Sequence, residues 1–102
     1  LRDLIDMKHS AVAIVAAVTK HFRRLYGARL GIDEGITLQE MTKLLDYRSD
    51  YAAKKTMASA QRFSVRKLRR AQKLCLEADI ALKSNNADEK RIVELLLMRI
   101  TV

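Results

Sequence analysis

The sequence lacks the residues that tight turns need: it contains no proline, and only three of its 102 residues are glycine. An all-β sandwich or barrel needs many such turns, so this scarcity argues against one. Tryptophan is also absent, and aromatic residues make up 5% of the chain. Good helix formers predominate instead, namely Ala, Leu, Met, Lys, Arg and Gln. With 49% apolar residues the chain can bury a core, so the composition predicts an all-α fold.

Cysteine and long apolar runs are scarce as well. The single cysteine cannot form an internal disulfide, which fits a reducing cytosol. The longest uninterrupted apolar run, residues 11–18, is far shorter than the roughly 20 residues that cross a bilayer. No stretch has the sections of a signal peptide. We therefore expect a cytoplasmic protein with no membrane partner, and, because the chain begins with Leu1, a fragment of a longer chain.

Start and stop signals divide the first third of the chain. Residues 1–7 are typical of the end of a helix. Ser10 is a candidate N-cap for a long helix that reaches about Leu30, and Gly31 and Gly35 are expected to end it. This helix has an apolar stripe at helical spacing, formed by Ile14, Val15, Val18, Phe22 and Leu25.

The strongest start signal follows these glycines. Thr37 and Glu40 have the spacing of a capping box, in which each side chain accepts a hydrogen bond from a free backbone N–H of the first turn. Ile36 and Met41 stand where a hydrophobic staple would pair them. The pattern predicts a short helix that ends at about Asp46.

Three further polar residues predict helix starts: Ser49, Ser64 and Asp88. The helix after Ser64 should reach about Lys83, with a core line formed by Leu68, Ala71, Cys75, Ala78 and Leu82. The chain has room for one modest core. We therefore predict a single domain over residues 1–102, built as a compact bundle of about five helices plus a short N-terminal helical remnant.

Residues that could support catalysis are few. His9 and His21 stand twelve residues apart without cysteine or carboxylate partners at ligand spacing, so we expect no metal site. Cys75 falls on a core line, where an inert buried thiol is the simpler interpretation. Three scattered glycines cannot build a phosphate-binding loop. The sequence predicts no catalytic residue, no cofactor and no small-molecule substrate, and so a fragment that is not an enzyme.

Asp79 stands out because it falls inside an apolar arc. At 100° per residue it lies only about 20° from Leu68 around the helix. A buried carboxylate must be paired or hydrogen-bonded, and Lys83 follows four residues later in the favourable order. The pattern predicts a structural role for Asp79, either in a partly buried ion pair with Lys83 or as a tie between helices.

The formal charge of +8 is concentrated in one region. Residues 48–73 contain nine lysines and arginines against one acid, Asp50. Several of these cations begin the fourth helix, where the helix dipole disfavours positive charge. We predict a surface for an anionic partner, either nucleic-acid phosphates or an acidic neighbour, although a solvated basic face would explain the same residues. Its members are Arg62, Arg66, Lys67, Arg69, Arg70 and Lys73.

Five stretches resemble a known family. They are residues 35–41 (GITLQEM), 53–55 (AKK), 60–64 (AQRFS), 77–84 (EADIALKS) and 93–99 (VELLLMR). Together they are similar to the C-terminal domain of the delta subunit of bacterial DNA polymerase III. The chain departs from the family pattern at residues 48–51, where family members often have a proline and an aromatic residue. It departs again after Ser64, where acids often stand in place of the basic residues here.

The resemblance implies a role in DNA replication. In the clamp loader, delta binds and opens the sliding clamp through its N-terminal domain, and it does not use ATP itself. The C-terminal domain joins those of the other subunits in a helical collar. The resemblance therefore implies a non-catalytic oligomerisation domain in the bacterial cytoplasm, whose partners are other clamp-loader subunits, with non-specific nucleic-acid contact as a further expectation.

An alternative from a different class is a helix-turn-helix-like DNA-binding module. A short helix over residues 38–45, a turn, and a second helix over residues 50–61 carrying Lys54 and Lys55 would suit it. Base reading usually needs Arg, Asn or Gln near the start of the second helix, where this sequence has mainly Lys and Ala.

Overall fold

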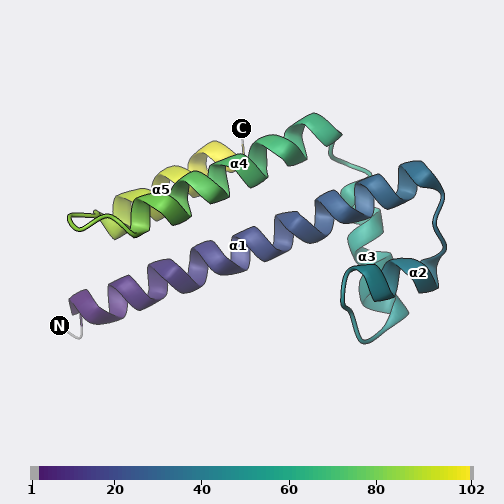
Figure 1. The fold of residues 1–102 in the computed structure, drawn as a ribbon, viewed down its shortest axis with the longest axis horizontal. Coiled ribbons are helices and arrows are strands. Elements are labelled where there is room, and N and C mark those ends of the chain that lie inside the picture. Colours follow the sequence, from purple (N-terminus) through teal and green to yellow (C-terminus); the bar gives the residue numbers. More distant parts are fainter. Residues whose placement is uncertain (1–2, 102) are drawn as a thin grey trace. The chain divides into compact units, whose positions relative to one another are not determined.

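The computed structural model describes the backbone of residues 3–101 and the side chains of residues 10–101. Within that part of the chain there are five α-helices and no strand, so the all-α prediction is confirmed (Figure 1). The helices are α1 (Asp3–Glu34), α2 (Leu38–Leu44), α3 (Asp50–Ala60), α4 (Val65–Leu82) and α5 (Glu89–Ile100). The side chains of residues 1–9, among them His9, lie outside the described residues.

The first helix is continuous across Ser10, which corrects the expected helix start at that residue. Helix α1 runs for 32 residues from Asp3, so the N-terminal remnant is part of it. No proline or glycine occurs before Gly27, and nothing therefore interrupts the backbone hydrogen bonds at Ser10. A serine can cap a helix, but its presence inside a run of helix formers does not start a new one.

Helix α1 ends at Glu34, immediately before Gly35, rather than near Leu30. Gly35 has a φ of 72°, the left-handed conformation that a glycine adopts without steric cost. Its N–H donates to the carbonyl of Ile32 at 3.1 Å, and the N–H of Ile36 donates to that of Gly31 at 3.1 Å. This pair of hydrogen bonds is the Schellman arrangement, which satisfies the last carbonyls of a helix.

Gly31 lies inside α1, so the prediction that it marks the helix end is wrong. A Cβ built at Gly31 would stand 2.5 Å from Met41 Cε and 2.8 Å from Ile36 Cδ1. The missing side chain therefore makes room for two apolar residues that follow the turn. Gly31 is needed for close packing, not for a special backbone angle.

The capping box that starts α2 is confirmed. The N–H of Glu40 donates to Thr37 Oγ1 at 3.2 Å, and the N–H of Thr37 donates to Glu40 Oε1 at 2.9 Å. The hydrogen bond from the Thr37 backbone is the larger of the causes that hold the pKa of the Glu40 carboxyl below its usual value. The ionised carboxylate is the form that accepts this bond.

The other three predicted caps are also present. In each, a side-chain oxygen accepts a backbone N–H three residues later, which satisfies a free donor of the first turn. The pairs are Ser49 with Ala52 at 3.3 Å, Ser64 with Lys67 at 3.1 Å, and Asp88 with Arg91 at 3.2 Å.

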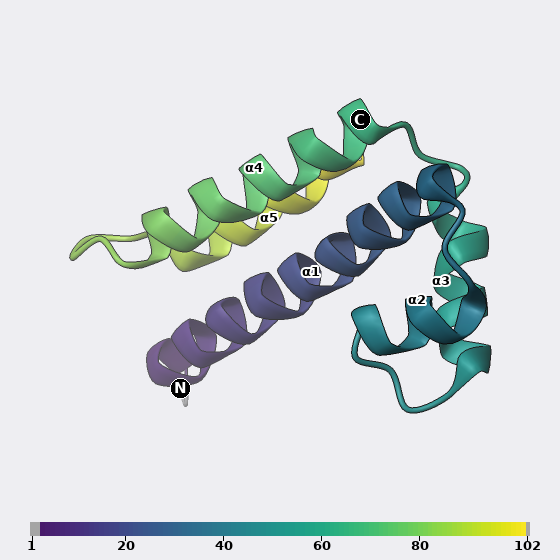
Figure 2. The ribbon, with the colours of Figure 1, turned by 45° about the vertical axis from the view of Figure 1, so that its right-hand side comes forward.

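The chain forms two compact units. One contains the residues up to Lys20 together with those from Arg70 onward, and the other contains residues 21–69. We refer to them as the terminal unit and the central unit. In the terminal unit, α4 and α5 lie side by side and run in opposite directions (Figures 1 and 2).

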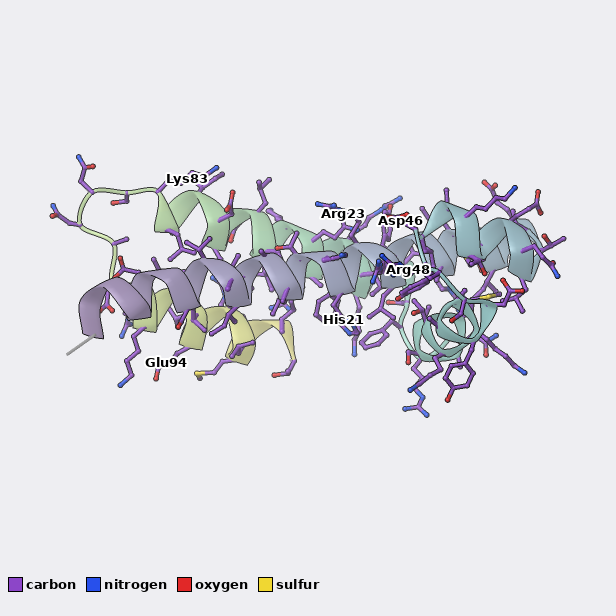
Figure 3. All side chains as sticks on the ribbon, turned by 90° about the horizontal axis from the view of Figure 1, so that it is seen from below. His21, Arg23, Asp46, Arg48, Lys83 and Glu94 are labelled. Atoms are coloured by element: carbon purple, nitrogen blue, oxygen red, sulfur yellow. The ribbon has the colours of Figure 1, made fainter. Side chains whose placement is uncertain are left out.

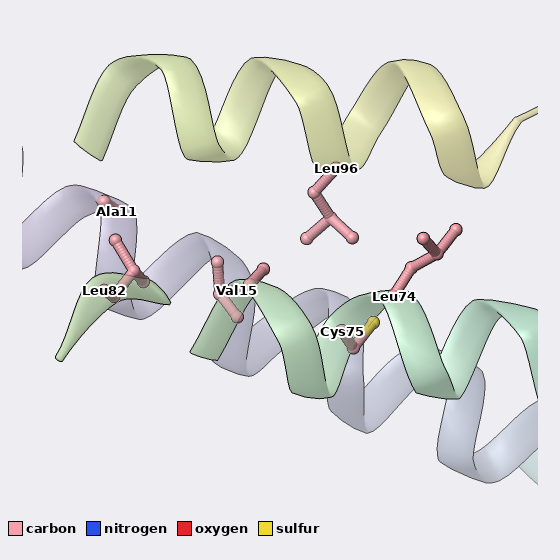
Figure 4. Packing of buried hydrophobic residues seen from close by; sticks show 7 residues of the cluster. Ala11, Val15, Leu74, Cys75, Leu82 and Leu96 are labelled. Carbon is pink, nitrogen blue, oxygen red and sulfur yellow. The ribbon is translucent and has the colours of Figure 1, made fainter. Parts of the chain in front are cut away.

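Each unit has its own apolar cluster. In the terminal unit, Leu96 points from α5 towards Val15 of α1 and Leu74 of α4 (Figure 4). The buried residues of this cluster are Ala11, Val15, Leu74, Cys75, Ala78, Leu82 and Leu96. Those of the central unit are Leu25, Ala28, Met41, Leu45, Ala53, Ala60 and Leu68. All five residues of the predicted core line of α4 are buried.

We predict that Gly35→Ala lowers the free energy of unfolding by about 1 kcal/mol or more, because an alanine strains the left-handed backbone. Gly35→Asn should cost less, since asparagine tolerates this conformation better. Urea denaturation followed by circular dichroism measures both changes. An alanine variant as stable as the parent would contradict the role of Gly35 in ending α1.

Candidate interaction surfaces

The six basic residues predicted to meet an anionic partner are all exposed. Arg62 lies in the turn between α3 and α4, and the other five lie on α4. Arg62, Arg66, Lys67 and Arg69 belong to the central unit, whereas Arg70 and Lys73 belong to the terminal unit.

Arg69 is held by its own unit. Its Nε–H donates to the hydroxyl oxygen of Tyr26 on α1 at 3.3 Å. This hydrogen bond raises the pKa of the Arg69 guanidinium above its usual value. Both residues belong to the central unit, so the contact ties the start of α4 to α1 within it. The sequence gives no signal for a pairing across 43 positions.

Arg70 has a structural partner as well. Its Nη1 donates to the backbone carbonyl of Arg99 at 2.8 Å, in the last turn of α5. Carbonyls at a helix C-terminus lack intrahelical partners and carry the negative end of the helix dipole. Arg70 therefore caps α5 from the neighbouring helix. Two of the six predicted cations, Arg69 and Arg70, thus donate hydrogen bonds within their own units.

The central unit nevertheless carries a large excess of positive charge. It contains eleven lysines and arginines against five aspartates and glutamates. On α3, Lys54 and Lys55 are exposed, and Lys55 Nζ stands 5.7 Å from the ring centroid of Tyr51. The Tyr51 side chain is itself exposed at 71%. Exposed cations beside an exposed aromatic ring are the groups that phosphates and bases can contact.

Arg24 makes a contact that sequence reasoning missed. Its Nε–H donates to the Leu45 carbonyl at 3.2 Å, and its Nη2 donates to the Asp46 carbonyl at 3.4 Å. The guanidinium carbon lies 4.1 Å from the ring centroid of Tyr47. Asp46 has a φ of 58°, so the chain turns sharply after α2. Arg24 holds this turn against α1 within the central unit.

The predicted partners Asp79 and Lys83 stand close together, with Nζ and Oδ2 3.2 Å apart. The side chain of Asp79 is 49% exposed and that of Lys83 is 75% exposed, so Asp79 is half-buried and Lys83 is exposed. Lys83 points away from the helices (Figure 3). Asp79 lies at the edge of the apolar arc, and water solvates it there. A pair with this exposure contributes little to stability.

An apolar groove lies between α4 and α5 in the terminal unit, with a volume of about 200 Å³. Its apolar lining comes from Leu74, Ala78 and Ala81 on α4 and from Ile92, Leu95 and Leu96 on α5. Two charged residues, Glu77 and Arg99, complete the lining. The sequence predicted the core line to which Ala78 belongs, but it did not predict the groove.

The remaining candidates for chemistry lie in ordinary environments. His21 is exposed (Figure 3). Its ring meets that of Phe22 edge-on, with 5.2 Å between the ring centroids. Burial raises the pKa of the Cys75 thiol, only partly offset by the Thr19 hydroxyl. Among the described residues, no group of three His, Cys, Asp or Glu side chains could hold a metal ion. None of the described helices is long and apolar enough to cross a membrane.

The described part of the chain is therefore all-helical, and its helices expose both charged and apolar side chains. By its sequence, the chain belongs to the family of C-terminal domains of the DNA polymerase III delta subunit, whose family model matches residues 1–100. No match was found among curated proteins or among solved structures.

We predict that Arg24→Ala lowers the free energy of unfolding by about 2 kcal/mol, because two carbonyls lose a charged donor and Tyr47 loses its cation. Asp79→Ala should change it by about 0.5 kcal/mol or less, since an exposed ion pair is weak. Denaturant unfolding of both variants compares them directly. Equal losses would show that the Arg24 contacts add nothing beyond a surface pair.

Proposed function

We propose that this chain is the collar domain of a clamp-loader delta subunit, a non-catalytic assembly domain that binds other subunits of the loader. The observation that carries the proposal is the family match over residues 1–100. The domain would act in DNA replication in the bacterial cytoplasm. Its work would be packing against neighbouring subunits, with clamp binding left to other parts of the delta protein.

The distribution of exposed apolar side chains supports an assembly role. Ten large apolar residues are exposed among those described, and seven of them lie in the terminal unit. These seven are Val12, Ile14, Leu76, Ile80, Leu95, Leu97 and Met98. Water contact with so many apolar side chains on one small unit is unfavourable, and a partner that covers them would remove this cost.

The environments of the candidate reactive groups support a non-catalytic role. The Cys75 thiol is buried and its pKa is raised, so its reactive thiolate form is disfavoured. Asp79 faces Lys83 at the surface. A catalytic acid or base would instead face a substrate-sized cavity.

We further propose that the central unit offers a contact for an anionic partner, through Arg62, Arg66 and Lys67. These three side chains are exposed, and no hydrogen bond or ion pair from them to another described side chain occurs in the structure. The unit's excess of cations supports attraction to nucleic-acid phosphates without base reading.

The helix-turn-helix-like alternative differs in what it predicts about DNA. Helices α2 and α3 are joined by residues 45–49, which is longer than the three- or four-residue turn typical of that motif. Strong preference for one duplex sequence at physiological salt would favour the alternative. Weak, steeply salt-dependent binding that ignores sequence would favour the contact proposed for the central unit.

The assembly proposal predicts that a full-length delta protein co-purifies with its clamp-loader partners only when residues 1–102 are present. Deleting this segment should abolish co-purification, because the collar contacts are lost. The deleted protein should still bind the sliding clamp, which serves as the control for folding of the remainder. Intact assembly after the deletion would overturn the proposal.

A further inference from the structure

The groove between α4 and α5 lies on the terminal unit beside its apolar cluster, and three members of that cluster, Leu74, Ala78 and Leu96, help to line it. Ala78 and Ala81 on α4, which have small side chains, and Leu95 on α5 are among the residues that line it. Leu95 is exposed at the edge of the groove. The neighbouring residue Leu96 lines the groove and is also buried in the apolar cluster, so the groove lies directly against the core of the unit (Figure 4).

The size of the groove restricts its occupant. Pockets for small molecules usually enclose about 300 Å³ or more, whereas this groove has a volume of about 200 Å³. That volume suits one large apolar side chain. A hole of this kind, bounded by residues from two helices, is what a side chain from a third helix fills in helical packing.

The charges at the groove restrict the chemistry further. Glu77 on α4 and Arg99 on α5 bring opposite charges to the two sides, and no ion pair joins either to another described side chain. Glu77 would repel the phosphate or anionic lipid headgroup that Arg99 attracts, so the two side chains together offer an anion no net attraction. A protein helix can present both signs, with a base towards α4 and an acid towards α5.

We propose that this groove receives a large apolar side chain from an amphipathic helix of a neighbouring clamp-loader subunit, flanked by a base that pairs with Glu77 and an acid that pairs with Arg99. The inference rests on the proposed assembly function and names the surface that performs it. Burying Leu95 and the two alanines under the incoming side chain stabilises the contact. The opposite charges fix the direction in which the partner helix lies.

The test uses the full-length protein and the other subunits of its own clamp loader. Leu95→Lys places a charge at the groove, Ala81→Leu fills it, and Glu77→Lys reverses a flanking charge. Each should weaken the subunit affinity about tenfold or more, measured as Kd by biolayer interferometry. Leu44→Lys, at an exposed leucine of the central unit, and Arg91→Glu, outside the groove on α5, are matched controls that should stay within about twofold.

The outcomes separate this inference from the assembly proposal. Groove variants that bind partners like the parent, while deletion of residues 1–102 abolishes assembly, would overturn the groove and leave the collar function standing. Thermal unfolding of every variant checks that it is folded. If Leu95→Lys or Ala81→Leu lowers the melting temperature, the binding affinity of Glu77→Lys tests the groove instead, because Glu77 is exposed. Self-association of the parent protein that Leu95→Lys abolishes would identify a second copy as the occupant and contradict the proposal.

Discussion

Burial of one face along each long helix is the constraint on which this structure depends. Helix α1 contributes Ala11 and Val15 to the cluster of the terminal unit, and Leu25 and Ala28 to that of the central unit. Helix α4 divides its buried residues in the same way, with Leu68 in the central cluster. In proteins most of the stability of a helix comes from the packing of its apolar face, so the packed face holds each helix in place. The opposite faces remain free for other contacts.

The two units differ in what they expose, and this difference gives the functional account its physical basis. The terminal unit carries most of the exposed large apolar side chains, together with the groove between α4 and α5. The central unit carries most of the excess positive charge. Apolar surface favours association with proteins, whereas a basic surface attracts anions. One small helical domain can therefore offer two kinds of contact.

Local features of the fold could be predicted from the sequence, because their signals lie within a few residues. The capping box of Thr37 and Glu40 and the core line of α4 are of this kind. The predicted helix start at Ser10 was wrong, because a residue that can cap a helix also occurs inside a helix when no proline or glycine interrupts that helix. The predicted helix end at Gly31 was wrong as well, because glycine is favoured both at helix ends and where side chains pack closely against the backbone.

The candidate surfaces could be predicted only in part, for a physical reason. Composition located the basic region, but hydrogen bonds between distant residues decide which cations are free. Arg69 and Arg70 bond to groups 43 and 29 positions away, and Arg24 bonds to carbonyls beyond α2. Asp79 lay near the boundary of an apolar arc, where a small rotation of the helix decides between burial and exposure. Such pairings follow from the tertiary packing, which the periodic pattern does not specify.

The most direct test of the buried-face account compares two leucines on α4. Leu68 is fully buried, whereas Leu76 is 59% exposed. Chemical denaturation should show that Leu68→Ala lowers the free energy of unfolding by about 2–5 kcal/mol, and that Leu76→Ala lowers it by about 0.5 kcal/mol or less. Equal losses for the two variants, or a larger loss at Leu76, would contradict the assignment of the buried face and with it the account of the surfaces that remain free.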